Sequence, residues 1–162
     1  MRALIATIVA ALLGCPLTAQ TASVQDLGQR CAASGSPGLT ATPPVVGQFC
    51  TITYAGNNVC CLVPATLTAM PLLVLGVAPV PYQIPGWACS LAFQPVLTQA
   101  TSGIDPIHNL FGTTVTLAVP PLYGFQFYAQ WVTITSSCQP TNTNCVVNSV
   151  KSSNAARLTI GV

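Results

Sequence analysis

Prolines interrupt the most hydrophobic stretch after the first nineteen residues, Leu62–Pro81, at four positions. A proline inside an α-helix removes a backbone hydrogen bond and clashes with the preceding turn, at a cost of about 3 kcal/mol. The stretch therefore cannot form a regular helix, and no membrane span is predicted here for the mature chain. We expect instead a buried β-strand near Leu72–Val77, entered and left through proline turns.

Short β-rich runs bounded by proline, glycine and threonine recur along the rest of the chain, and helix signals are almost absent after the first nineteen residues. The clearest strand is Phe125–Ile134. Its apolar residues Phe125, Phe127, Ala129 and Trp131 alternate with Gln126, Tyr128 and Gln130. Since alternate residues of a strand point to opposite faces, this pattern predicts an apolar row on the core and a polar-aromatic row outside.

Six further strands are predicted: Gly112–Val119, Gln48–Tyr54, Leu72–Ala78, Ala88–Phe93, Cys145–Val150 and Ala155–Ile160. About seven short strands separated by turn signals are typical of an all-β fold, specifically a two-sheet antiparallel β-sandwich with Greek-key or jelly-roll connections. The sequence does not show the Cys, Trp, Cys spacing of an immunoglobulin domain, which disfavours that version of the sandwich.

The first nineteen residues have the pattern of a secretion signal peptide. Arg2 supplies a positive charge, an apolar run follows, and Leu17-Thr18-Ala19 is a small-residue cleavage site. We expect cleavage there to leave residues 20–162 as a single exported domain, outside the cell or on its outer surface. A lipoprotein is the alternative, because Leu12-Leu13-Gly14-Cys15 resembles a bacterial lipobox in which Cys15 would carry the lipid.

Seven of the eight cysteines follow the signal segment, and in an exported chain most of them should be oxidised. Cys138 and Cys145 flank a turn-rich segment that a bridge between them would staple. Cys31 with Cys89 is a weaker pairing, because several connectivities remain open.

Cys50 is expected to pair with Cys60 or Cys61, with Cys61 preferred. Neighbouring strand residues point to opposite faces, so one of these two adjacent cysteines is expected to remain a free thiol or to link two chains. Neither this pair nor the lone histidine offers the ligand spacing of a structural zinc site, so we expect no metal.

Charged residues make up only 4% of the chain, and its formal net charge is +2. Such a chain has too few basic residues to form the positively charged surface that binds nucleic acid or anionic lipid. Asp26, Asp105 and His108 are the whole supply of conventional acids and bases, and no Gly-x-Ser-x-Gly elbow occurs. Asp105-Pro106-Ile107-His108 is interpreted as a proline turn rather than an acid–base pair. We therefore expect no enzyme and no cofactor.

Four residues are candidates for a ligand-binding surface: Tyr128, Trp87, Tyr82 and Gln130. Aromatic rings stack on apolar ligand faces and amides fix orientation, so these residues could hold a sugar. Trp131 shares the apolar row with Phe125 and Phe127 and is assigned to the core instead.

A neutral, threonine-rich surface disfavours ionic ligands and leaves sheet edges without their usual charged protection. We expect a non-catalytic structural or interaction module of the cell envelope or extracellular matrix. Its protein or glycan partner is unidentified, and it is also expected to be capable of self-association. A carbohydrate-binding or adhesive domain is the alternative.

Three segments resemble a family of small exported modules from planctomycete-like bacteria: Pro85-Gly86-Trp87-Ala88-Cys89-Ser90-Leu91, Phe127-Tyr128-Ala129-Gln130-Trp131-Val132 and Ser153-Asn154-Ala155-Ala156-Arg157-Leu158-Thr159-Ile160-Gly161. Those modules are charge-poor β-sandwiches with no assigned activity. The resemblance implies a fold but no site residues, and it supports pairing Cys31 with Cys89. The other cysteines of the mature chain depart from the family pattern and imply added stapling.

Overall fold

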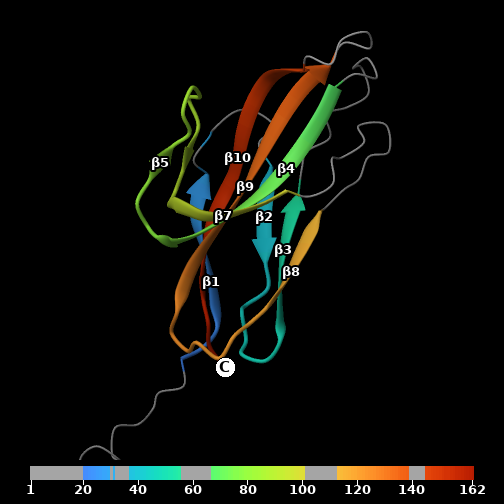
Figure 1. Ribbon diagram of the computed structural model, residues 1–162. Helices are drawn as coiled ribbons and strands as arrows, with labels where there is room; N and C mark the ends of the chain where they lie inside the picture. Colours follow the sequence, from blue (N-terminus) through green and yellow to red (C-terminus); the bar gives the residue numbers. More distant parts are fainter. Residues whose placement is uncertain (1–19, 30, 32–36, 56–66, 101–112, 139–144) are drawn as a thin grey trace, which may run out of the picture.

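The computed structural model describes residues 20–29, 31, 37–55, 67–100, 113–138 and 145–162 (Figure 1). All regular elements among these residues are β-strands, which confirms the predicted all-β class. None of the described residues forms a helix of the length and hydrophobicity that a membrane crossing requires. The proposed signal segment and Cys15 lie outside the described residues.

The strands are β1 (Ser23–Gln29), β2 (Gly38–Ala41), β3 (Phe49–Ala55), β4 (Leu67–Ala78), β5 (Tyr82–Gln83), β6 (Ser90–Leu91), β7 (Gln94–Ala100), β8 (Thr114–Ala118), β9 (Gln126–Cys138) and β10 (Cys145–Thr159). They form a five-stranded sheet in the order β1-β10-β9-β4-β7, a three-stranded sheet in the order β2-β3-β8, and the small β5–β6 ribbon. All strand pairs are antiparallel. The two larger sheets face each other as the predicted sandwich (Figure 1).

Several predicted strand boundaries were wrong. The strands predicted at Cys145–Val150 and Ala155–Ile160 are one strand, β10, bent by irregularities in its pairing with β9. Ala88–Phe93 contains only the two-residue β6. The edge strands β1, β2 and β7, and the short β5, carry no clear alternation, and the sequence did not predict them.

Pro71 was predicted to precede its strand but lies inside β4, paired with Thr133 of β9. The described pairing between β4 and β7 starts only at Leu72. The Pro71 side chain is fully buried, so the apolar strand runs through this proline instead of starting after it.

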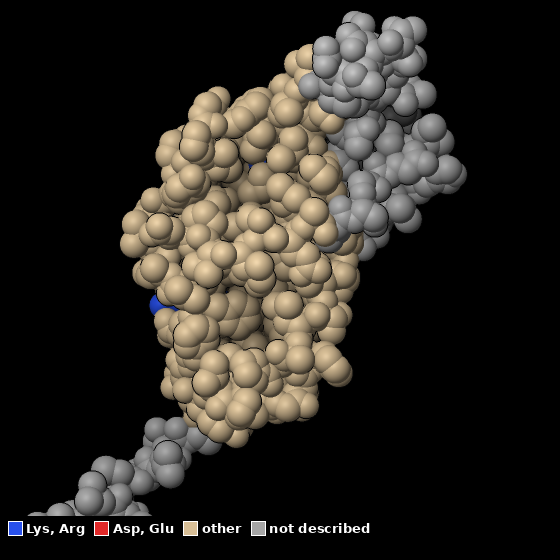
Figure 2. Space-filling model, in the orientation of Figure 1, with Lys and Arg blue, Asp and Glu red and all other residues tan. Residues whose placement is uncertain are grey.

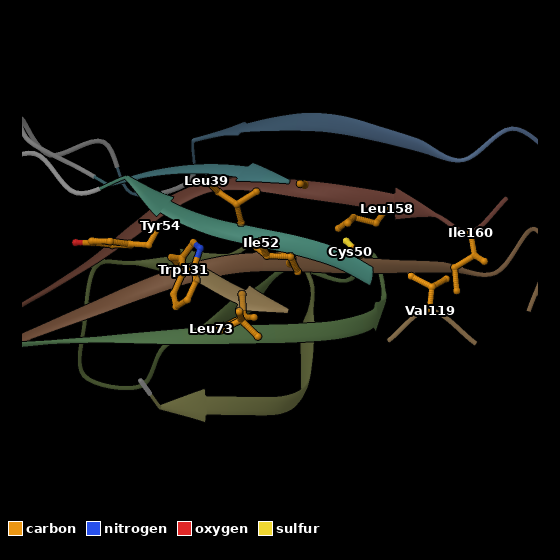
Figure 3. Close-up of a cluster of buried hydrophobic side chains, with 12 residues drawn as sticks. Leu39, Cys50, Ile52, Tyr54, Leu73, Val119, Trp131, Leu158 and Ile160 are labelled. Atoms are coloured by element: carbon orange, nitrogen blue, oxygen red, sulfur yellow. The ribbon is translucent and has the colours of Figure 1, made fainter. Parts of the chain in front are cut away.

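The main core fills the space between the two sheets (Figure 3). Trp131 of β9 is fully buried there, as predicted, and meets the ring of Tyr54 edge to face with centroids 5.6 Å apart. Figure 3 shows Trp131 between Tyr54 and Leu73, so that side chains from β3, β9 and β4 interlock. Aromatic rings in this geometry contribute about 0.5–1.5 kcal/mol beyond their buried area.

A second core lies on the opposite face of the five-stranded sheet. The chain between β4 and β7 folds back over this face and supplies Leu91, Ala92 and Phe93. The disulfide between Cys31 and Cys89 ties this covering segment to the chain beyond β1. Closing a loop of 58 residues stabilises a fold by about 4 kcal/mol in the chain-entropy account. The central strands of this sheet, β4, β9 and β10, thus have buried residues on both faces.

Side chains at a bulge in β10 connect this strand to β9 and to β2 of the smaller sheet. Its register against β9 shifts between Ser152 and Ala155. The Asn154 side chain then reaches the smaller sheet, where its Oδ1 accepts the Leu39 N–H at 2.7 Å and its Nδ2 donates to the Leu39 carbonyl at 3.2 Å. The Ser153 Oγ accepts the Trp131 N–H at 2.9 Å. An extra residue in one strand re-aims its side chains in this way.

Asn154→Ala should destabilise the protein by about 1–3 kcal/mol, because it leaves the part-buried Leu39 N–H and C=O without these partners. Asn148→Ala is the matched control, since Asn148 is exposed and accepts only a 3.3 Å bond from Ser137. Urea denaturation midpoints measure both changes. Equal midpoints for the two variants would contradict the linking role of Asn154.

Gly76 of β4 allows the covering segment to approach the sheet. A Cβ at this position would overlap the Phe93 ring and the Gln94 carbonyl oxygen. Gly76→Ala should therefore cost about 1–3 kcal/mol through overpacking, whereas Gly38→Ala, whose Cβ would meet Ala55 at an ordinary 3.6 Å, serves as the control. Thermal unfolding compares the two, and an unchanged melting temperature for Gly76→Ala would show that the segment is not tightly packed.

Candidate functional site

The structure does not bring the four predicted ligand-binding residues together on a surface. Tyr128 retains 5% of its exposure and stacks on Phe93 with centroids 5.8 Å apart. Gln130 is fully buried; its Oε1 accepts the Ala92 N–H at 3.0 Å and its Nε2 donates to the Ser153 carbonyl at 2.8 Å. The prediction that this row faces solvent was wrong, because the segment between β4 and β7 covers it.

Tyr82 and Trp87 both lie in the covering segment, on or beside β5. Tyr82 is exposed, whereas Trp87 is half-buried and packs against the second core. Gln83 is held by hydrogen bonds from its Nε2 to the Trp87 and Cys89 carbonyls. One exposed ring and one partly covered ring do not form the three-aromatic platform expected from the sequence.

The predicted pairing of Cys31 with Cys89 is confirmed. The predicted bridge from Cys50 was wrong: its thiol is free and buried, and its Sγ donates to the Thr42 carbonyl at 3.2 Å. Cys50 lies on the inner face of β3, within the core between the sheets.

Two other cysteine predictions remain open. The strand register places Cys138 directly opposite Cys145, as a bridge between them requires, but their side chains lie outside the described part of the structure. Cys60 and Cys61 lie outside the described residues altogether, as do Asp105 and His108.

The three described charged residues lie on the edge strand β1 and on its neighbour β10 in the five-stranded sheet: Asp26, Lys151 and Arg157. Asp26 Oδ1 accepts the Gly28 N–H at 2.8 Å, and Arg157 donates to Gln25. Within the described ranges no group of three histidine, cysteine or acidic residues is arranged to hold a metal ion. The face drawn in Figure 2 shows almost no charged atoms.

An apolar groove with a cavity volume of about 320 Å³ lies on the β4–β7 side of the sandwich. Its lining comes from β4, β7 and β9 of the larger sheet, from β3 and β8 of the smaller sheet, from the chain between β8 and β9, and from Ile160 after β10. Its lining contains no charged residue and consists of Cys50, Leu75, Gly76, Val77, Val96, Leu97, Leu117, Ala118, Val119, Pro120, Leu122, Phe125, Phe127 and Ile160.

The rim of this groove exposes large apolar side chains to solvent. Val96 keeps 69% of its exposure, Leu97 54% and Val77 53%, and Leu122 and Phe125 are exposed beside them. Contiguous apolar surface of this kind marks interaction sites more often than isolated exposed residues do. The sequence does not predict β7, because Val96 and Leu97 are adjacent and break the alternation that identifies a strand.

No protein-family model, curated protein or solved structure matches this chain.

Burial raises the pKa of the Cys50 thiol above its ordinary value, although the hydrogen bond with Thr42 opposes this effect. The thiol therefore stays protonated at neutral pH, and the thiolate is the reactive form. Alkylation of Cys50 by iodoacetamide should be at least tenfold slower in the native protein than after denaturation. Peptide mass spectrometry measures the modified fraction at Cys50, and equal rates in the two states would show that the inner face of β3 is open to solvent.

Proposed function

We propose that this chain is an exported, non-catalytic structural or interaction module of the cell envelope or extracellular matrix, which acts by binding other polypeptides. The observation that carries the proposal is the uncharged apolar groove that opens between two sheet edges. Burying exposed apolar surface contributes about 25 cal/mol per Å², so covering the rim residues supplies a driving force for association.

The position of the charges supports a polypeptide partner over an ionic ligand. Asp26 and Arg157 lie on β1 and β10, and β9 and β4 separate those strands from β7. Among the residues that the structure describes, no charged group therefore faces the groove to orient a small anion or cation. A partner would be held by apolar contact and by backbone hydrogen bonds at the sheet edges.

The residue inventory supports the non-catalytic part of the proposal. Asp26 is exposed on β1 and accepts a hydrogen bond from the backbone of its own turn. Cys50 is buried and protonated, which leaves it a poor nucleophile. A general acid–base mechanism requires such groups to be within reach of a substrate.

The burial of Tyr128 and Gln130 favours this proposal over a glycan-binding surface. Flat sugar-binding platforms depend on exposed rings that share one face. Here Tyr82 is exposed, but Trp87, predicted to lie beside it, is half-buried and Tyr128 is buried.

The exported full chain should associate, with itself or with an envelope protein, in a way that salt does not weaken. Charged contacts are screened as ionic strength rises from about 0.05 to about 1 M, whereas apolar contacts are not. Light scattering across protein concentrations, combined with chemical cross-linking in the exporting cell, measures this association. A strict monomer at millimolar concentration that cross-links to no protein would contradict the proposal.

A further inference from the structure

The larger sheet extends beyond the smaller one at the groove. The larger sheet has five strands and the smaller sheet three. β2 lies over β10, as the hydrogen bonds between Asn154 and Leu39 show. No described strand of the smaller sheet is then left to lie over β7. Leu97 pairs with Leu75 and shares its inward face, yet more than half of the Leu97 side chain is exposed.

The edge of β8 beside this gap has free backbone groups. The Tyr54 N–H donates to the Thr113 carbonyl, and the Val119 N–H donates to the Gln48 carbonyl. Odd-numbered residues of β8 thus direct their backbone groups toward β3. In an antiparallel ladder the intervening residues direct theirs the other way. Thr114, Thr116 and Ala118 therefore present N–H and C=O groups to the open edge, where no described strand pairs with them.

β8 also lacks the devices that protect other edges of this fold. On β1, Asp26 and a register shift at Gly28 make the edge charged and irregular. β7 has Pro95 and a shift in its pairing with β4. β8 is regular along its pairing with β3 and contains no charged residue or proline. A regular, neutral edge strand is a template for pairing with another chain.

We propose that a second copy of this chain places an extended segment in the groove, where it pairs with the open edge of β8 and covers the inner face of β7. The described part of the smaller sheet is one strand short of covering β7. The N–H and C=O groups at the open edge of β8 are suited to a polypeptide backbone rather than to an acyl chain. The lining requires uncharged side chains, and a chain with 4% charged residues supplies them. The inference rests on the proposed interaction function and identifies its partner.

Two variants of the groove and one control test the proposal by sedimentation velocity of the exported full chain. Val96→Lys places a charge on the rim, and Thr116→Pro removes an N–H that points to the open edge without touching the bonds to β3. Each should weaken self-association at least tenfold. Val146→Lys is the control, because Val146 is similarly exposed, at 64%, but lies at the start of β10 and does not line the groove.

Residue-resolved hydrogen exchange of the unmodified chain gives a second readout that does not depend on any variant. Association should slow exchange at the amides of Thr114, Thr116 and Ala118. It should leave Val115 and Leu117 unchanged, because those amides already donate toward β3.

Association that is equally strong in both groove variants would overturn this inference and leave the proposed function standing. The inference would also be overturned, with the proposed function still standing, if the wild-type chain bound only another protein or only an alkyl probe and hydrogen exchange at the β8 amides did not slow. A wild-type chain that associates with nothing contradicts both proposals.

Discussion

The arrangement of the two sheets and the covering segment depends on the hydrogen bonds made around the β10 bulge at Ser153 and Asn154. Gln130 joins the covering segment to β10, Ser153 joins β10 to β9, and Asn154 joins β10 to β2. Three polar side chains thus connect all three layers through backbone groups. These side chains are buried or part-buried, and an unmade hydrogen bond at such a site costs about 1–3 kcal/mol, so the network selects one relative placement of the layers.

The scarcity of charge becomes informative once the layers are in place. A protein with so few ionic groups depends on apolar packing, backbone ladders and a disulfide for stability, and the second core beneath the covering segment shows how this is achieved. The few charges of the described part gather on β1 and β10. On the β4–β7 side of the sandwich, the described residues form an apolar groove whose lining carries no charge. Both the proposed interaction function and its partner follow from this asymmetry.

Particular elements show what a pattern can predict. The alternation along Phe125–Ile134 placed Trp131 in the core, and the structure confirms it. The same alternation placed Tyr128 and Gln130 outside, and this was wrong because periodicity reports that a strand has two faces but not what covers the second one. Adjacent Val96 and Leu97 in an edge strand carry no period at all. For that reason the groove, which is the main candidate site, was not predicted from the residues that line it.

The sequence alone determined the class of this fold, because prolines exclude helix from the apolar stretch Leu62–Pro81 and short alternating runs favour strands. It also determined the chemistry that is available, since a chain with two acids and one histidine cannot present many ionic sites. The tertiary structure decided which faces are buried. It folded the β4–β7 connection over one face of the larger sheet and placed no described strand of the smaller sheet opposite β7. The reason is physical: burial and edge exposure arise from contacts between segments distant in the chain, which no local pattern encodes.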